Sequence, residues 1–200
     1  MTRTYTLKKR AEKQAETRQR IVEAAMELHS TVGPASTSMS QIAERAGVQR
    51  HTLYAHFPDE RSMALACSGL FAERQPLPDP EPWTAIVDPR DRLRTGLRAL
   101  YAWYERNAGL LGCVIRDAEH HALTREMAEM RFIPALVRIR EVLGDGVSPD
   151  RSALLGLALD FHTWRRLSQA EGLGSDTAAE AMIKAILEPT FQTVRPPESD

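Results

Sequence analysis

Cysteine is scarce in this sequence, with only Cys67 and Cys113 among 200 residues. Two cysteines cannot build the disulfide framework of a small secreted domain, so a reducing compartment is expected. No stretch approaches the roughly 18 uninterrupted apolar residues of a membrane span. The charged N-terminal segment has no apolar run behind it, which argues against a secretory signal. The sequence therefore predicts a cytoplasmic protein that has no membrane partner.

Common catalytic motifs are missing as well. There is no Gly-rich phosphate loop, no Gly-x-Ser-x-Gly elbow and no His-Glu-x-x-His motif. A cluster of polar residues suggests a metal site as an alternative: Asp117, Glu119, His120 and His121. Adjacent side chains on a helix point about 100° apart, so the two histidines cannot easily share an ion, and a solvated helix end is favoured. We expect no enzyme, no catalytic residue, no cofactor and no metal. The two cysteines could form a redox sensor, but small buried hydrophobic residues are the favoured interpretation.

Charge is unevenly distributed although the formal net charge is only −1. Residues 1–20 hold seven Lys and Arg residues against two Glu residues, whereas residues 63–200 hold 16 basic and 20 acidic residues. A basic head on an acidic body suits a protein that touches a polyanion at one end. A solvated tail would show the same pattern, so the charge indicates nucleic-acid contact only together with other features.

Helical periodicity dominates the chain, and strand alternation is nearly absent. Apolar residues line one face of 11–30, and Gly33–Pro34 breaks this amphipathic helix. Further helices are predicted at 39–46, 49–56 and 59–73, the last with Asp59 as its N-cap. Five prolines within 75–89 exclude a helix interior and predict an extended connector.

Four more helical segments are expected behind the connector: 90–107, 109–141 (divided near 118–124), 149–171 and 176–193. The predicted fold is therefore all-α with about nine helices. It has a small helical head at 1–74, which includes the basic arm and the connecting helix 59–73. A larger helical body follows at 90–194. The tail at 195–200 is expected to be disordered, because it holds two prolines and two acidic residues.

The most informative stretch is 38–57, SMSQIAERAGVQRHTLYAHF. Ser38 can cap the first helix, Ala43 is small where two helices must cross, and Gly47 supplies the positive φ of a three-residue turn. Val48 and Leu53 complete a small core. The second helix then exposes side chains that reach base edges and phosphates. An ordinary helical hairpin with a polar face is the alternative.

This stretch resembles the N-terminal signature of the TetR-type regulators. The resemblance covers the thirty residues TSMSQIAERAGVQRHTLYAHFPDERSMALA, and the Leu-Tyr-x-His-Phe-Pro string that closes the second helix is its most specific part. The segment 157–182 is similar to the dimerisation region of many members. The resemblance implies a TetR/AcrR-type helix-turn-helix transcriptional regulator: a three-helix DNA-binding head, and a larger helical body for dimerisation and effector binding. The function it implies is a dimeric repressor that a small molecule releases from its operator.

By position, the resemblance implies that Gln49, Arg50 and His51 enter the major groove of double-stranded DNA. Thr52, Tyr54 and His56 would hold the DNA backbone, and Ser38 would offer a phosphate contact. Two positions depart from the family pattern. His51 stands where members often have a small residue, and Glu60 stands where they commonly have a phosphate-binding Lys. Arg61 is the candidate to replace that contact. If the head binds a protein instead, the chain is a helical interaction protein.

The body is expected to form a homodimer through helices 153–168 and 177–191, because both are apolar on nearly every side and need cover on two faces. Such a dimer would read a pseudo-palindromic operator. A helix central in a monomer is the alternative. The effector pocket that the resemblance implies is expected between 90–141 and 153–167. Its candidate lining residues, any of which can instead fill the core, are Trp103, Tyr104, Val114, Met127, Met130, Phe132, Phe161 and His162.

Overall fold

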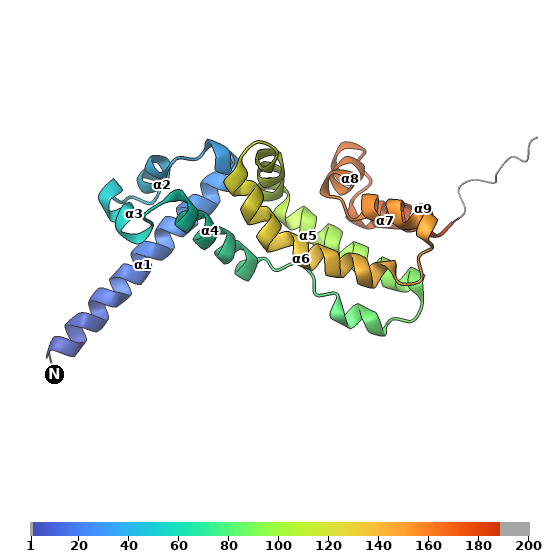
Figure 1. Ribbon diagram of the computed structural model, residues 1–200, viewed down its shortest axis with the longest axis horizontal. Helices are drawn as coiled ribbons and strands as arrows, with labels where there is room; N and C mark the ends of the chain where they lie inside the picture. The colour runs from blue at the N-terminus through green and yellow to red at the C-terminus, as the bar shows by residue number, and fades with distance from the viewer. Residues whose placement is uncertain (1, 189–200) are drawn as a thin grey trace, which may run out of the picture. The chain divides into compact units, whose positions relative to one another are not determined.

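The computed structural model describes residues 2–188 and contains nine α-helices and no β-strand over that range (Figure 1). This confirms the predicted all-α fold class within the described residues. The helices are α1 (Thr2–Thr31), α2 (Met39–Arg45), α3 (Arg50–His56), α4 (Glu60–Arg74), α5 (Pro89–Ala118), α6 (Ala122–Gly144), α7 (Ser152–Ala158), α8 (Phe161–Arg165) and α9 (Ser175–Leu187). None of these helices is long and apolar enough to cross a membrane.

The described residues form two compact units. The first comprises 2–77 and 107–134, and the second comprises 78–106 and 135–188. The long helices α5 and α6 each contribute one part to each unit. The first unit therefore contains more than the head expected from the sequence, because the end of α5 and the start of α6 pack with it.

The core of the first unit forms where α1 to α4 meet. Ile21 and Ala25 of α1 and Leu53 of α3 are fully buried, and Ile42 of α2 and Met63 of α4 pack in the same cluster. Burying an aliphatic side chain of this size stabilises the fold by about 1.5–3 kcal/mol relative to leaving it exposed. This core fixes the short helices α2 and α3, which at seven residues each are too short to be stable alone.

The N-terminal part of α1 is longer than the sequence predicted. The helix was expected at 11–30, but it begins at Thr2 and stands clear of α2 and α3 at its N-terminal end (Figure 1). The basic residues of the arm therefore lie on a helix, and Lys8, Lys9 and Arg10 are all exposed. The prediction started the helix at 11 because it followed the apolar face, and residues 8–20 have no apolar face.

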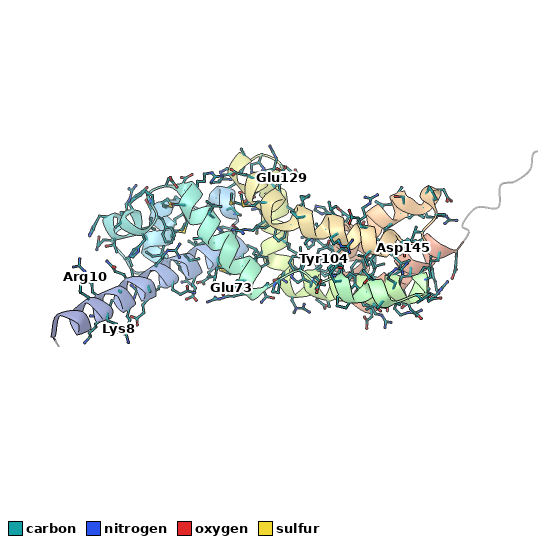
Figure 2. The ribbon with its side chains drawn as sticks, turned by 60° about the horizontal axis from the view of Figure 1, so that its bottom comes forward. Lys8, Arg10, Glu73, Tyr104, Glu129 and Asp145 are labelled. Carbon is teal, nitrogen blue, oxygen red and sulfur yellow. The ribbon has the colours of Figure 1, made fainter. Side chains whose placement is uncertain are left out.

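The second unit is built on a cluster of aromatic side chains. Tyr104 contacts Trp103 at 5.7 Å, Phe161 at 5.5 Å and Trp164 at 5.8 Å between ring centroids, and it lies inside this unit (Figure 2). All four side chains are buried. Edge and tilted ring arrangements of this kind contribute about 0.5–1.5 kcal/mol per pair beyond the area that they bury.

The predicted helix 149–171 is not continuous, and this prediction is wrong. A 3₁₀ turn opens the segment, α7 ends at Ala158, α8 begins at Phe161, and a π-helical turn follows at Arg166–Ala170. The break has two causes. The hydroxyls of Tyr101 and Tyr104 donate to the carbonyls of Ala158 and Leu159, at 2.9 and 2.6 Å, so those carbonyls are bonded outside a helix. Asp160 then caps α8 by accepting from the amides of residues 162 and 163.

The remaining predicted boundaries are partly right. The break expected between 107 and 109 is absent, because α5 continues through Gly109, where a Cβ would lie 3.6 Å from the carbonyl oxygen of Ser30. The division near 118–124 is confirmed, since α5 ends at Ala118 and α6 begins at Ala122. The last helix starts at Ser175, close to the prediction, but it ends at Leu187 and not at 193, because Glu188 has an extended backbone. Residues 189–193 and the tail 195–200 lie outside the described residues.

The proline-rich connector 75–89 is not extended throughout. Residues Glu81–Ala85 form a 3₁₀ helix with Trp83 buried, and proline is tolerated near the start of such a turn. The buried Arg92 of α5 donates to the carbonyl of Ile86 at 2.7 Å and pairs with the Asp145 carboxylate at 3.0 Å. The apolar Trp83 side chain and these contacts of Arg92 account for the folded connector.

Candidate nucleic-acid interface

A rigid turn joins α2 to α3. Gly47 adopts φ +64°, and the amide of Val48 donates to the carbonyl of Ala43 at 2.9 Å. A Cβ on Gly47 would meet nothing within 4 Å, so the positive φ, rather than crowding, explains the glycine. Ala43 and Ala46 are buried where α2 approaches its neighbours. The turn geometry is the one that the sequence predicted.

Ser38 holds the start of α2 in a capping box. Its hydroxyl accepts from the amide of Gln41 at 3.3 Å, and the Gln41 side chain accepts from the Ser38 amide at 2.7 Å. Such a box satisfies two of the amides that a helix start leaves unpaired. Ser38 is exposed, so its hydroxyl lies at the positive end of the helix dipole, in reach of an anion from solvent.

The outer face of α3 carries hydrogen-bonding side chains. Gln49, the N-cap residue, makes no capping bond with its side chain, and it is exposed together with Arg50, His51 and Tyr54. The Arg50 guanidinium lies 5.9 Å from the centroid of the Tyr54 ring, which restricts its direction. Thr52 and His56, the two remaining predicted residues on α3, are half-buried. One short helix thus presents all six side chains on a buried, fixed backbone.

A basic groove lies between the N-terminal part of α1 and α3. It is lined by the following residues of the two helices: Lys9, Arg10, Lys13, Gln14, Thr17, His51, Thr52, Ala55 and His56. No acidic residue lines it. In Figure 2, Lys8 and Arg10 are labelled on this part of α1. The charge of the arm is readable from the sequence, but the helix that faces it is not. Lys9, Lys13 and Thr17 recur every four residues, so helical periodicity places them on one face of α1, and this face lines the groove with α3.

Arg61 and Glu60 begin α4 behind the Asp59 cap. The Asp59 carboxylate accepts from the Ser62 amide at 2.7 Å, and this hydrogen bond lowers the pKa of Asp59 below its usual value. Arg61 forms an ion pair with Glu126 of α6. Arg61 is the residue predicted to make the phosphate contact that a lysine at position 60 makes in many family members. Its guanidinium already has an acidic partner, and its contact with DNA stays a prediction.

The loop between α1 and α2 is held by the end of α5. The carboxylate of Asp117, 1% exposed, accepts from the Ala35 amide at 2.9 Å and from the Arg116 side chain at 2.8 Å. Burial works to raise the pKa of Asp117, but the hydrogen bonds from Arg116 and Ala35 outweigh it and lower the pKa. The Arg116 guanidinium also donates to the carbonyl of Val32 at 3.0 Å. These contacts fix the loop from which α2 starts.

Residues 21–67 match the family described as bacterial regulatory proteins of the tetR family. The HTH-type transcriptional regulator AcrR of Shigella flexneri is 46% identical over 48 residues, which are 24% of this chain and 22% of that regulator. The head of this chain is a TetR/AcrR-type helix-turn-helix. The match spans about a fifth of that curated relative's length, so the direct likeness in sequence is confined to the helix-turn-helix head.

Solved structures of this family have the same fold as the chain. NalD, the secondary repressor of the MexAB-OprM multidrug efflux pump in Pseudomonas aeruginosa, is similar with a TM-score of 0.59 and 26% identity, over 88% of this chain and 95% of NalD. HlyIIR, a hemolysin II transcriptional regulator, gives a TM-score of 0.65 at 16% identity, over 88% and 99% of the two chains. A TetR-like regulator from Rhodococcus sp. RHA1 gives 0.62 at 21%, over 84% and 92%. At these identities the last two show the fold alone.

The eight residues predicted to line an effector pocket do not lie together. Val114, Met127 and Phe132 line a cavity inside the first unit. Trp103, Tyr104 and Phe161 belong to the aromatic cluster of the second unit, and Met130 and His162 are exposed. The prediction grouped these residues because aromatic side chains and methionines often line ligand pockets. In the second unit, however, the tyrosine hydroxyls bond to backbone carbonyls and the rings pack on one another, as they do in a filled core. Their part in ligand binding stays a prediction.

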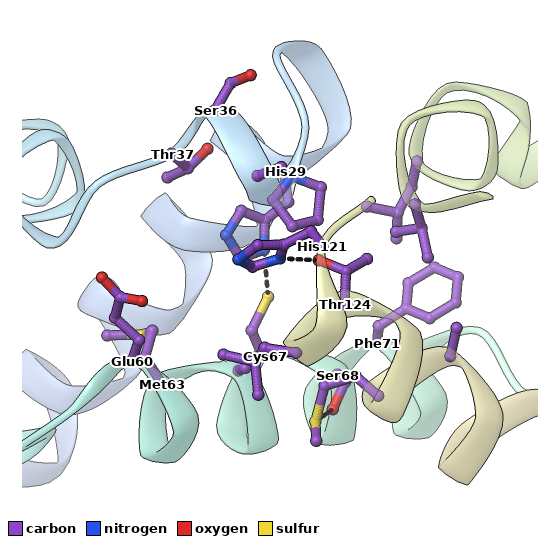
Figure 3. Close-up of a pocket in the computed structure, with 18 of the residues that line it drawn as sticks. His29, Ser36, Thr37, Glu60, Met63, Cys67, Ser68, Phe71, His121 and Thr124 are labelled. Atoms are coloured by element: carbon purple, nitrogen blue, oxygen red, sulfur yellow. Dashed lines mark hydrogen bonds between the residues drawn. The ribbon is translucent and has the colours of Figure 1, made fainter. Parts of the chain in front are cut away.

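Sequence reasoning missed most of the wall of this cavity. It is lined by His29 of α1, the turn 34–38, the start of α2, α4, and α5 and α6 near the loop that joins them (Figure 3). The one available signal was the pair His29 and Cys67, polar side chains on otherwise apolar helix faces. Burial lowers the pKa of His29 to about 4 and raises the pKa of Cys67 to about 12. Both groups are therefore uncharged at neutral pH.

Proposed function

We propose that this protein is a dimeric, DNA-binding transcriptional repressor of the cytoplasm that a small-molecule effector releases from its operator. The observation that carries the proposal is the exposed face of α3, where six hydrogen-bonding side chains stand on a helix that is fixed by a buried core and a glycine turn. Side chains held this way can read base edges without first paying to order the backbone. The matches to tetR-family proteins support it, as does the printed description of NalD as a repressor.

The proposed contacts follow the positions of the side chains along α3, as the resemblance implies. Gln49, Arg50 and His51 at the start of α3 are assigned to base edges in the major groove, since the first residues of a recognition helix reach deepest. Thr52, Tyr54 and His56 are assigned to the DNA backbone. Ser38 is assigned to a phosphate at the start of α2. Sequence-specific binding needs both the base-edge contacts and the backbone contacts, because phosphate contacts position the protein and base contacts specify the site.

The function is tested by selecting bound duplexes from a random DNA pool with the full chain. We expect a short pseudo-palindromic sequence to be enriched, since a two-fold protein demands matching half-sites. Footprinting of the enriched duplex should show two protected major-groove segments one helical turn, or a multiple of it, apart. Recovery of unrelated sequences that bind no better than the starting pool would contradict the proposal.

The basic groove predicts a salt effect. Replacing Lys9 and Lys13 by glutamine should weaken binding to all duplexes and should make the plot of log affinity against log salt concentration shallower. Each phosphate contact contributes about −0.9 to that slope, so two lost contacts reduce its magnitude by up to about 1.8. Arg106→Gln, which removes an exposed basic side chain of α5, is the control and should leave the slope unchanged. Equal slopes for all three proteins would mean that α1 makes no contact with DNA.

The dimer is proposed through α7, α8 and α9, which replace the two continuous helices expected from the sequence. Apolar side chains of this region remain in solvent in the single chain: Leu157 is 54% and Leu173 40% exposed, and Ala181 is exposed on α9. Ala181→Glu should therefore fold normally but separate the dimer, because the seam would desolvate an unpaired carboxylate. Operator affinity should fall with the loss of the dimer.

Sedimentation and operator titration measure both effects. Ala122→Glu, a charge added at an exposed alanine of α6, is the matched control and should remain dimeric. A monomeric variant that still protects both half-sites as tightly as the original protein would contradict the proposed role of the dimer.

Effector release means that ligand and operator oppose one another. Linkage makes the antagonism reciprocal, so operator DNA must weaken effector binding by the same factor as the effector weakens operator binding. Coupling energies of about 1–3 kcal/mol are typical, which correspond to roughly 5–150-fold. The proposed route is α4, which joins the head to the rest of the chain and lies in both the head core and the cavity wall through Met63 and Cys67.

A further inference from the structure

The cavity of the first unit has the size and shape of a small-molecule site. Its volume is about 360 Å³, near the lower end of the range for ligand pockets. All its walls come from the first unit: α1, the turn before α2, α2, α4, and residues 110–132 of α5 and α6. More than half of the lining residues are apolar. The aromatic ring of Phe71 closes one side, next to Ser68 and Thr124 (Figure 3).

Only two of the lining residues carry a full charge, Glu60 and Arg131. Glu60 is exposed at the start of α4, where solvent hydrates its carboxylate. The Arg131 guanidinium donates to the hydroxyl of Ser68 and the carbonyl of Leu65, both at 3.3 Å. The rest of the wall is apolar or neutral, so a charged ligand would lose its hydration over most of its surface.

Two histidines supply the directional contacts. His29 Nδ1 lies 3.4 Å from the Sγ of Cys67, and His121 Nδ1 lies 2.7 Å from the Oγ1 of Thr124 (Figure 3). In the tautomer in which the protonated Cys67 thiol donates to His29 Nδ1, the ring proton of the neutral imidazole lies on Nε2. Neither Nε2 atom has a hydrogen-bond partner among the described residues.

We propose that this cavity binds an uncharged, predominantly apolar small molecule that carries an oxygen acceptor, such as a carbonyl, and that this oxygen accepts a hydrogen bond from Nε2 of His29. The apolar body of the ligand packs on Met39, Ile42, Met63 and Phe71. The oxygen of the ligand takes the place of water as the acceptor for His29 Nε2. The His121 imidazole offers a second polar contact, and it can donate or accept there because its tautomer can change.

The position of the cavity adds a regulatory consequence that rests on the proposed function. Met39 and Ile42 belong to α2, and Ser38, which caps α2, also lines the cavity. A ligand in this site therefore touches the helix-turn-helix itself. Occupancy stabilises one placement of α2, so operator affinity rises if DNA binds that placement better and falls if DNA binds another placement better.

The experiment uses the full chain and two fluorescent probes of similar size. Prodan is an uncharged naphthalene ketone whose emission moves to longer wavelength when its carbonyl is hydrogen-bonded, and anilinonaphthalene sulfonate carries a fixed negative charge. We expect saturable binding of prodan and at least tenfold weaker binding of the sulfonate, which corresponds to about 1.4 kcal/mol. Equal binding of the two probes, or none of prodan, would overturn the assigned ligand class.

Two sets of variants locate the bound probe. Ala128→Phe fills the cavity from α6 and should weaken prodan at least about tenfold, whereas Ala122→Phe, an exposed position of the same helix, should have no effect. His29→Leu should weaken prodan by roughly 2–12-fold, the range for one neutral hydrogen bond, and shift its emission to shorter wavelength. His29→Gln retains a donor and should restore both properties.

These measurements also separate the site from the function. Prodan binding that survives Ala128→Phe in a protein with unchanged helical circular dichroism would overturn the site. A prodan emission wavelength that is the same in the original protein and in both His29 variants would overturn the assignment of His29 as the donor. Operator affinity is measured separately: if prodan binds as expected and the operator is bound equally with and without it, the site stands and its regulatory consequence fails. If no operator is selected at all, the proposed function fails while the site stands.

Discussion

Arg50→Ala is expected to weaken binding to the selected operator by about 1–3 kcal/mol, the value of a good bidentate contact to a base edge. Arg50→Lys is the sharper variant, because it retains the charge but loses the planar fork that recognises two acceptors together. The lysine variant should therefore lose discrimination at particular operator positions while its salt dependence stays unchanged. Gln49→Ala should relax a different position of the site.

Tyr54→Phe is the matched comparison on the same helix. It retains the ring that packs under the Arg50 guanidinium and removes only the hydroxyl. We expect a uniform loss across all sequences, since a phosphate contact carries no sequence information. Titration of each variant against the operator, single-base substitutions of it and random duplexes gives the answer. Equal losses on operator and random DNA for all the variants would show that these residues do not read bases.

Gly33→Ala is expected to be the most destabilising small substitution in the first unit. Gly33 has φ +100° and ψ +156°, a region that is nearly restricted to glycine and costs other residues about 1–3 kcal/mol. A Cβ here would also lie too close to the Asp117 carboxylate and the Arg116 guanidinium. Displacing that carboxylate breaks its hydrogen bond with the Ala35 amide and adds about 1–3 kcal/mol.

Urea unfolding of three proteins tests this expectation. Gly47→Ala is the matched control, because its φ is also positive but its new Cβ would meet no atom within 4 Å. The free energy of unfolding of the Gly47 variant should fall only by the cost of backbone strain. That of the Gly33 variant should fall clearly more, because crowding is added to the strain. Removing the clash in an Asp117→Ala background should reduce the cost of Gly33→Ala, since neighbouring substitutions are not additive. Equal losses at Gly33 and Gly47 in the original protein, or a cost of Gly33→Ala that is no smaller in the Asp117→Ala background, would contradict the crowding argument.

The sequence was most informative where the local signal is strong. Gly47, Ala43 and Leu53 predicted two short helices joined by a tight turn, and the resemblance of this stretch to TetR-type regulators favoured a helix-turn-helix over an ordinary helical hairpin. Prolines and glycines likewise placed most of the helix boundaries. The exposure of residues 49–51 and 54 followed from the same helical register.

The sequence was least informative where distant residues decide. The break between α7 and α8 depends on hydroxyls of Tyr101 and Tyr104, which lie more than 50 positions away in the chain. The cavity depends on His29, Cys67 and His121, three side chains from three helices that share no motif. Periodicity describes which face of a helix is apolar, but it does not say which other helix covers that face.

The shared wall between the head core and the cavity bears on directed evolution of this protein. Met39, Ile42, Met63 and Cys67 serve both structures, so libraries at these positions would change ligand preference and the seating of α2 together. Leu123 and Ala128 line the cavity from α6 and are absent from the head core. Randomising only this side offers a biosensor designer a way to retune the ligand while the DNA-reading surface stays as it is.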